Sequence, residues 1–436
     1  MLKPRICILA LAAIAATGCS GRPEGRGGVT VEVWSGWTGQ EAVSFQRLCD
    51  EFNRSHPGVR IHNRGGVTDN SMVIRAITAG VPPDCFTIWN AGDVGPLAAY
   101  GAISNLDAQY KASGLKEEDL VPGAVDQCKY RGHFIGVPLL MDTNALFWNK
   151  DAFREAGLDP ERPPRTMAEL KDYAVRLTLK DRSGDIRRLG LMLPDTTLLC
   201  WVFGGDFVDS SGRPTADTPA NIRAFKFYKA LVDGMGGRER VEAFGSGFGV
   251  VQGPNHPFFV GKVAMMVNGE WIPSWIERYA PRLHYGVAPV PYEASRPDLK
   301  GTTLIGVNLL AIPTEAKHPG EAWEFLRWLQ RPEVQLEFAQ ALNNVPNTRS
   351  ALRMRRLTTG SEARRNYGKF WQIAQNVHAR GFPVSPVGQL YQDELGRATE
   401  FVMFGTKTPE AALADLQAKV EKELKAQRKG NEEIAN

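Results

Sequence analysis

Tryptophan residues recur where the predicted strands of this chain end, and each has a hydrogen-bonding side chain close by in the sequence. The four are Trp37, Trp89, Trp201 and Trp271, and their polar neighbours are Glu41, Asp93, Asp206 and Glu270. A sugar ring presents apolar C–H faces and polar edges, so flat aromatic rings beside carboxylates suit it. For any single Trp the alternative interpretation is packing in the hydrophobic core. The functional interpretation is that several of the four line one cleft that binds a carbohydrate.

Strand and helix patterns alternate over the first ninety residues. Apolar and polar residues alternate over 29–33, and short apolar stretches follow at 59–62 and 85–89. Helical patterns lie between them, and the first begins with a capping box formed by Thr38 and Glu41. This order predicts a parallel sheet covered by helices. Ligands of such sheets bind beyond the carboxyl ends of the strands, which is where these Trp residues fall.

Sequence motifs that would indicate catalysis or nucleotide binding are missing. There is no His-Glu-x-x-His, no Cys-x-x-Cys and no Gly-Lys-Ser/Thr loop. Gly247, Gly249 and Gly253 have the wrong spacing for a nucleotide motif, so we interpret them as a mobile loop. The seven histidines lack metal-ligand spacing. We therefore expect a binding protein that is not an enzyme and that uses no metal and no cofactor.

The N-terminus carries a targeting signal. Lys3 and Arg5 precede an apolar run, 6–16, that is too short to span a bilayer, and small residues then lead directly into Cys19. This pattern predicts a secretory signal peptide over 1–18. The cleavage site resembles a lipobox, in which Cys19 becomes the lipidated first residue of the mature chain. The alternative is an ordinary signal peptide with an incidental cysteine.

The segment after the cleavage site, 19–27, is rich in Gly and Arg and predicts a flexible tether. No other segment reaches the roughly 20 apolar residues of a transmembrane helix. The net charge of +4 includes two positive residues of the signal peptide, so the mature chain carries +2. This near-balance argues against a nucleic-acid partner. We expect an extracytoplasmic, lipid-anchored and monomeric protein.

Four cysteines remain in the mature chain besides Cys19, namely Cys49, Cys85, Cys128 and Cys200. An oxidising compartment permits disulfides, but these residues are widely spaced and a core of this size does not need a covalent link. We expect buried free thiols, with a Cys85–Cys128 bridge as the alternative.

One later stretch is a candidate for a connection between lobes, since 436 residues exceed one average domain. From 130 to 150, strand patterns follow one another closely around Asp142 and Asn144. Further on, the apolar run 263–267 lies between Gly-Lys and Asn-Gly, which predicts a buried strand that ends in a tight turn directly before Trp271.

Taken in order, these motifs resemble the extracellular solute-binding proteins of family 1, the carbohydrate-binding components of ABC importers. The resemblance covers residues 29 to about 352, and it depends on the order and spacing of several weak motifs. These are the lipobox ending at Cys19 and the stretches 29–34, 80–84, 136–150, 259–271 and 306–313.

The resemblance implies a two-lobed periplasmic-binding-protein fold of the type II kind, in which each lobe is an α/β sheet flanked by helices and hinge crossings join the lobes. By matching position, the first lobe would comprise 28–140 and 268–313, and the second lobe 141–267 and 314–436. The strand at 263–267 would then leave the second lobe as a crossing between the lobes.

The resemblance also implies a set of ligand-binding residues in the cleft. They are Trp37, Glu41, Asp69, Trp89, Asp93, Asp142, Asn144, Trp201, Asp206, Trp271, Asn308 and Arg380.

The function implied is an extracytoplasmic component of an ABC importer that binds a sugar or oligosaccharide and delivers it to the permease. One alternative is the same scaffold with another solute, such as glycerol phosphate or a polyamine. A phosphate ligand would need Arg or helix N-termini in the cleft, and Arg380 is the only Arg that the resemblance places there. A second alternative is a secreted carbohydrate-active enzyme.

Overall fold

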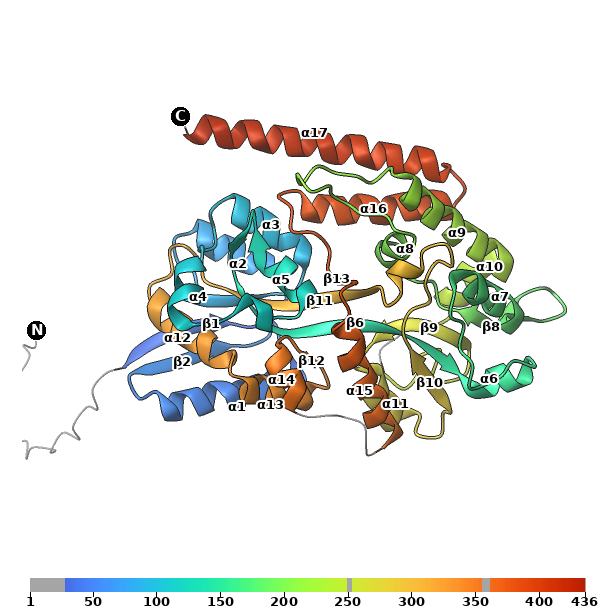
Figure 1. The fold of residues 1–436 in the computed structure, drawn as a ribbon, viewed down its shortest axis with the longest axis horizontal. Coiled ribbons are helices and arrows are strands. Elements are labelled where there is room, and N and C mark those ends of the chain that lie inside the picture. The colour runs from blue at the N-terminus through green and yellow to red at the C-terminus, as the bar shows by residue number, and fades with distance from the viewer. Residues whose placement is uncertain (1–27, 249–252, 355–360, 436) are drawn as a thin grey trace, which may run out of the picture.

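The structure is a computed structural model that describes residues 28–248, 253–354 and 361–435 (Figure 1). The predicted signal peptide, the lipidation site at Cys19 and the tether up to residue 27 lie outside the described residues. Gly249, in the predicted glycine-rich loop, lies outside them as well.

The first lobe begins with strands that alternate with helices. Its elements are β1 (Val29–Trp34), α1 (Gly39–Ser55), β2 (Val59–Arg64), α2 (Asn70–Thr78), β3 (Cys85–Ile88), α3 (Ala91–Ala99), α4 (Asp107–Ser113), a 3-10 turn (Glu117–Asp119), α5 (Pro122–Cys128), β4 (Lys129–Tyr130) and β5 (His133–Phe134). β1 pairs in parallel with β2 and with β3, as the strand–helix alternation predicts. The apolar face of α1 is buried through Phe45, Leu48 and Phe52.

The capping box predicted at Thr38 is wrong. Thr38 does occupy the N-cap position of α1, but its side chain makes no capping hydrogen bond. The side chain of Glu41 lines a cavity next to Asp142 instead. A carboxylate in the first turn still favours the helix, because it faces the positive end of the helix dipole.

The second lobe follows the long strand β6 (Val137–Asn149). Its elements are α6 (Lys150–Glu155), α7 (Met167–Leu177), β7 (Leu179–Lys180), β8 (Ile186–Leu191), α8 (Thr196–Val202), α9 (Pro219–Met235), α10 (Arg238–Ser246), β9 (Val263–Gly269), α11 (Ile272–Tyr279) and β10 (Tyr285–Ala288). β8 pairs in parallel with β9 and antiparallel with β7.

Two strands connect the lobes. The first half of β6 pairs with β11 (Thr303–Ala311), and the second half, from Asn144 onward, pairs with β9. The main sheet therefore runs through both lobes in the order β2-β1-β3-β11-β6-β9-β8-β7. Asp142 and Asn144 lie where β6 changes partners, so the predicted connection at 130–150 is found in the structure. The expected α/β fold with two lobes is confirmed (Figure 1).

The crossing predicted at 263–267 is wrong. Among the described strands, β9 pairs with β8 and with the second half of β6, so it lies within the second lobe. β10 then pairs with Leu146–Asn149 of β6, which keeps the chain in the second lobe until β11 returns it to the first. The sequence pattern of a buried strand is the same in either place, because it does not specify the pairing partner.

A second departure concerns 314–342, which the predicted boundaries place in the second lobe. This segment forms α12 (Pro319–Leu329) and α13 (Pro332–Leu342), and both helices pack against the first lobe. Phe325 of α12 lies 5.1 Å from Phe52 of α1, and Phe338 of α13 lies 5.8 Å from Phe45, measured between ring centroids. These aromatic contacts fix the two helices to α1.

The C-terminal part of the chain returns to the hinge and then covers both lobes. It comprises β12 (Val345–Pro346), α14 (Arg349–Met354), α15 (Glu362–Ala374), β13 (Ala379–Arg380), α16 (Gly388–Met403) and α17 (Pro409–Ala435). α16 contacts α3 of the first lobe as well as α8 and α9 of the second, and α17 lies along α16 (Figure 1). α16 thus bridges the two lobes at this side.

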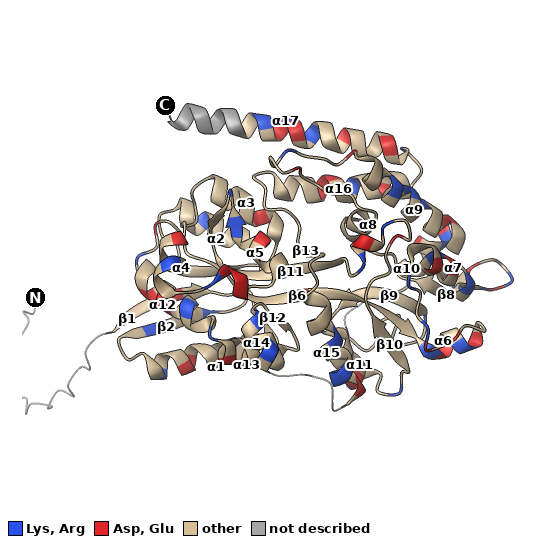
Figure 2. Ribbon diagram, in the orientation of Figure 1, with Lys and Arg blue, Asp and Glu red and all other residues tan. Residues whose placement is uncertain are grey.

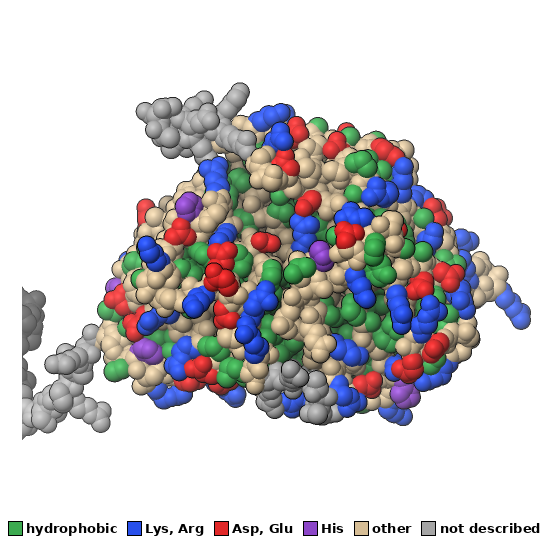
Figure 3. All heavy atoms as spheres, viewed as in Figure 1, with side chains coloured by type: hydrophobic (Ala, Val, Ile, Leu, Met, Phe, Trp, Pro, Cys, Tyr) green, Lys and Arg blue, Asp and Glu red, His purple; other side chains and the backbone are tan. Residues whose placement is uncertain are grey.

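Charges lie mainly on the outer helices and loops, and the central strands carry few of them (Figure 2). On the face shown in Figure 3, positive and negative side chains are interspersed. Among the described residues, no helix is both long and apolar enough to cross a membrane.

The four cysteines of the mature core are buried free thiols, as expected, and the alternative Cys85–Cys128 bridge is not formed. Burial raises the pKa of each thiol above its ordinary value. Since a thiolate is the reactive form, we expect the native protein to react with a water-soluble thiol reagent only after denaturation. Rapid labelling of the folded protein, measured by mass spectrometry, would contradict this.

Candidate functional site

Two adjoining cavities lie where β6 passes from one lobe to the other. Their volumes are about 240 and 270 Å³, and together they reach the roughly 300–1,000 Å³ of small-molecule sites. Both are lined by Trp89, Asp142 and Trp271. The smaller is also lined by Trp37, Glu41, Glu270, Ser274, Trp275, Asn308, Leu342 and Asn344. The larger is also lined by Asn90, Ala91, Gln127, Asn144, Leu304, Ile305, Gly306, Phe382 and Gln392.

Tryptophan rings from both lobes form the walls. Trp37 follows β1 and Trp89 follows β3, and their rings meet edge to face with centroids 5.1 Å apart. Trp37 is only 1 % exposed, so it is a core residue and a cavity wall at once. Trp271 and Trp275 come from the other lobe, at the start of α11 and one turn further along it. Because positions i and i+4 share a helix face, both rings reach the same cavity.

Glycine makes room for two of these rings. A methyl group at Gly36 would lie 1.9 Å from the indole Nε1 of Trp89, and one at Gly269 would lie 2.0 Å from the ring of Trp271. Both rings therefore lie directly against the backbone, which fixes their positions.

Three carboxyl groups converge on the smaller cavity from three elements. Glu41 comes from the first turn of α1, Asp142 from the middle of β6 and Glu270 from the residue after β9. The side-chain amide of Asn344 donates to Asp142 Oδ1 at 2.8 Å, and the backbone N–H of Thr143 donates to Glu270 Oε2 at 2.8 Å. Glu270 is 1 % exposed.

The pKa values of all three carboxyl groups are raised. Burial is the main cause for each, and the negative charge of Asp142 raises the pKa of Glu41 and of Glu270 further. Glu270 is held well above the ordinary range, while the hydrogen bond from Asn344 partly offsets the effect on Asp142. Placement in this cavity therefore disfavours the charged forms of the three carboxyl groups.

The raised pKa of Glu270 makes stability depend on pH. The unfolded chain ionises Glu270 freely above its ordinary pKa, whereas the folded protein resists ionisation, so this residue lowers the free energy of unfolding increasingly as pH rises toward the folded-state pKa. We expect Glu270→Gln to be more stable than the wild type at pH 8 and to lose that advantage near pH 4. Chemical denaturation at both pH values measures it; an advantage independent of pH would contradict it.

Asn144 and Asn308 also reach these cavities, Asn144 in the larger and Asn308 in the smaller. Asn308 is on β11 opposite Leu140 of β6, and it is almost fully buried. Of the predicted ligand-binding set, seven residues thus surround the two cavities. They are Trp37, Glu41, Trp89, Asp142, Asn144, Trp271 and Asn308.

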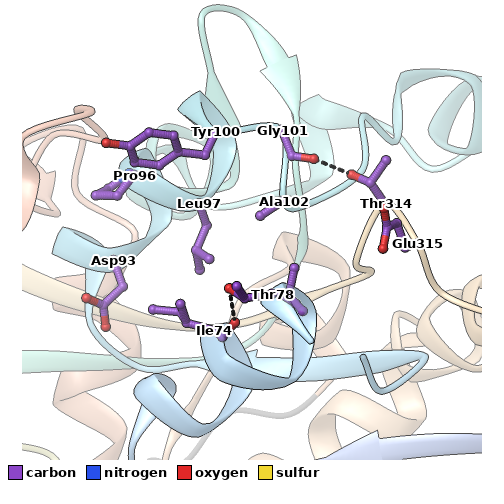
Figure 4. A pocket seen from close by; sticks show the side chains of 11 residues that line it. Ile74, Thr78, Asp93, Pro96, Leu97, Tyr100, Gly101, Ala102, Thr314 and Glu315 are labelled. Atoms are coloured by element: carbon purple, nitrogen blue, oxygen red, sulfur yellow. Dashed lines mark hydrogen bonds between the residues drawn. The ribbon is translucent and has the colours of Figure 1, made fainter. Parts of the chain in front are cut away.

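The other five lie elsewhere. Asp69 is the N-cap of α2, where its carboxylate accepts from Ser71 N at 2.8 Å. The hydrogen bonds from the side chain and backbone of Ser71 lower the pKa of Asp69. Asp93 accepts from Asn70 Nδ2 at 2.7 Å. It borders a different cavity, of about 480 Å³, between α2 and α3, where Ile74 and Leu97 point toward one another (Figure 4).

Trp201, Asp206 and Arg380 form a cluster of their own. Trp201 is 1 % exposed and packs on Phe207, and the Arg380 guanidinium lies 5.4 Å above its ring. Arg380 also donates to Asp206 at 2.6 Å. None of the three lines either cavity at β6. Trp201 is held inside the lobe by α8, whose residues apart from Thr197 are buried.

Several residues of the cavities were not in the predicted set. Glu270 is next to Trp271 in the sequence, and Trp275 shares a helix face with Trp271. The position of Trp271 therefore indicates both residues. Asn344 has no such local signal. It reaches Asp142 only because β12 pairs with β6 after α13.

Residues 36–336 match the model of the bacterial extracellular solute-binding protein family. The chain belongs to this family. Its members bind solutes and are not enzymes, and the family places the protein outside the cytoplasm.

Relatives of known ligand agree with this assignment. The structure is similar to that of CpMnBP1 solved with mannobiose bound, with a TM-score of 0.77 and 29% identity over 90% of this chain and 100% of the other. In sequence, the chain is 27% identical to the sn-glycerol-3-phosphate-binding protein UgpB of Escherichia coli K12, over 88% of this chain and 90% of UgpB. The sugar-binding protein MalE of Xanthomonas citri, at 22% identity and a TM-score of 0.75, shares the fold, with coverage of 92% and 98%.

Proposed function

We propose that this protein binds an oligosaccharide between its two lobes and delivers it to the permease of an ABC importer. The observation that carries the proposal is the pair of cavities at β6, where Trp89 and Trp271 from opposite lobes lie beside Asp142. Aromatic rings match the apolar faces of a sugar, and carboxylate and amide groups match its hydroxyls. The mannobiose bound to CpMnBP1, a relative at 29% identity, makes short manno-oligosaccharides the first ligands to test.

The proposed ligand-binding residues are those that line the cavities. We retain the seven that surround them from the predicted set and add Glu270, Trp275 and Asn344. Binding would stabilise the closed arrangement of the lobes, since only that arrangement lets residues of both lobes contact the ligand.

Glycerol phosphate is the second candidate, because UgpB is a relative of similar identity. A phosphate needs Arg, Lys or free backbone N–H groups around it. Within the described part of the chain, neither cavity at β6 is lined by Lys, Arg or His. Arg380 is bound to Asp206 instead. Oligosaccharide is therefore the better fit.

The test is a thermal-shift and calorimetry screen with mannobiose, mannotriose, glycerol 3-phosphate and spermidine. A ligand at 100 times its Kd adds about 2.7 kcal/mol to the free energy of unfolding. Stabilisation by the saccharides is expected. Stabilisation by glycerol 3-phosphate or spermidine alone would overturn the proposal, and so would product formation from the saccharides, which indicates an enzyme.

The lipid anchor at Cys19 is part of the same proposal. A tethered binding protein stays close to its permease, and a single acyl chain needs further chains or charges for stable anchoring. We expect mass spectrometry of membrane-extracted protein to find a lipid-modified Cys19 at the N-terminus, and Cys19→Ser to release the protein from the membrane. An unmodified N-terminus in the membrane fraction would contradict this.

A further inference from the structure

The smaller cavity at β6 has an excess of negative groups. Three of the residues that line it are acidic, Glu41, Asp142 and Glu270, and the others are aromatic, aliphatic, hydroxyl or amide residues. Among the described residues that line this cavity and its neighbour, none carries a positive charge. A neutral sugar would leave these acids uncompensated.

The buried carboxyl groups in the cavity have few N–H donors. Glu270 Oε2 receives one hydrogen bond, from Thr143 N, and the Asn344 amide donates to Asp142. Glu270 Oε1 is buried with no N–H donor within reach, and the Glu270 and Asp142 carboxyl groups hydrogen-bond to each other. Burying two carboxyl groups side by side disfavours their charged forms, so the site is suited to a ligand that brings several N–H groups.

A metal ion does not fit this arrangement. In the described parts of the chain, no three His, Cys, Asp or Glu side chains are placed to hold one. The walls beside the acids are the rings of Trp37, Trp271 and Trp275. Aromatic faces attract organic cations and also pack on the C–H faces of sugars.

The aromatic walls argue for a saccharide over a simple polyamine. Trp89 and Trp271 line both cavities from opposite lobes. Their flat rings match the apolar C–H faces of a sugar ring, whereas a polyamine has no ring face to offer.

We propose that the site selects a saccharide that carries a free amino group, with the ammonium between Asp142, Glu41 and Glu270. This inference rests on the oligosaccharide-binding function proposed above and narrows it to one class of sugar. The ammonium supplies the positive charge and the N–H donors that the cavity lacks, and the Trp rings hold the sugar.

Proton release on binding follows from this placement. Burial raises the pKa values of the three carboxyl groups, and a nearby ammonium favours their charged forms again. The other titratable groups that face them are few. Tyr367 of α15 lies close to Glu270, and Glu277 of α11 and Arg364 of α15 line an adjacent cavity that Glu270 borders. Affinity for the amino sugar should therefore rise between pH 5 and pH 7.

The experiment is titration calorimetry with matched sugars that differ only at the amino group. The probes are glucosamine, N-acetylglucosamine and glucose, the same three mannose derivatives, and the β-1,4-linked disaccharides of glucosamine, N-acetylglucosamine and glucose. Each is measured at pH 5.5 and 7.0 in two buffers of different ionisation enthalpy, with mannobiose and spermidine alongside. We expect an amino sugar to bind at least about tenfold more tightly than its acetylated and hydroxyl counterparts, with protons released.

Variants of the cavity test whether the ammonium group lies beside these acids. Asp142→Asn should remove the preference for the amino sugar, while the matched change Asp69→Asn, at an acid outside the cavity, should leave it intact. If Asp142→Asn does not fold, as judged by circular dichroism, then Glu41→Gln replaces it as the test, since Glu41 lines the same cavity from the first turn of α1. A preference that survives in the folded cavity variant would overturn the inference.

The outcomes separate the two proposals. Neutral sugars or mannobiose binding as tightly as the amino sugars would overturn the inference and leave oligosaccharide binding intact. Spermidine binding more tightly than every saccharide would overturn both, and so would the absence of binding by any sugar.

Discussion

Replacing Trp271 with Ala should abolish the stabilisation that a saccharide ligand gives, while the free protein stays nearly as stable as the wild type. Trp271 is partly exposed, lines both cavities at β6 and packs on the backbone at Gly269. Truncating a central aromatic contact typically costs about 2 kcal/mol or more, roughly a 30-fold rise in Kd. Thermal shift and calorimetry with the best ligand of the screen measure both quantities.

Trp201→Ala is the matched control, because the same substitution is made at a Trp outside the cavities. Its side chain is 1 % exposed and packs on Phe207, so truncation should lower the free energy of unfolding by about 3–5 kcal/mol. The Kd of the remaining folded protein should change little. If Trp201→Ala removed binding and Trp271→Ala did not, the site would lie in the cluster around Arg380.

Gly95→Ala should weaken ligand binding at least about tenfold through the contact that joins the lobes. Gly95 lies on α3, and a methyl group there would lie 1.8 Å from the backbone oxygen of Ser385, just before α16. α16 also contacts α8 and α9, so separating it from α3 disfavours the closed arrangement. A ligand that binds only the closed arrangement loses affinity in proportion. Calorimetry measures the loss, and small-angle scattering measures the arrangement of the lobes.

Gly396→Ala, on the same helix α16, is the control for this change. No atom lies within 4 Å of a methyl group at Gly396. Alanine inside a helix is more favourable than glycine by up to about 1 kcal/mol, so stability should rise and the Kd should stay the same. Equal affinities for both glycine variants would show that the α3–α16 contact does not influence binding.

The sequence predicted those parts of the site that local patterns determine. Trp37, Trp89 and Trp271 directly follow strands, and the carboxyl ends of strands in a sheet of this kind lie beside the ligand. The strand–helix alternation of the first lobe could be predicted equally well, because each buried face is formed by residues close together in the chain.

The pairing between strands that are far apart in the chain could not be predicted in this way. The strand at 263–267 was predicted correctly as a strand, but its partners determine which lobe holds it, and nothing local specifies them. Asn344 likewise reaches Asp142 through the pairing of β12 with β6. Asp69 shows the reverse case, because a local partner, Ser71, already binds this acid. Asp93 is bound by Asn70, which is 23 residues away in the chain.

The most direct test of the account is a crystal structure of the protein with the tightest-binding saccharide of the screen. We expect a sugar ring against Trp271, in the space shared by the two cavities, with Trp89 of the first lobe on the other side and Asp142 hydrogen-bonded to the sugar. A saccharide bound instead beside Trp201 and Arg380, or between α2 and α3, would contradict it.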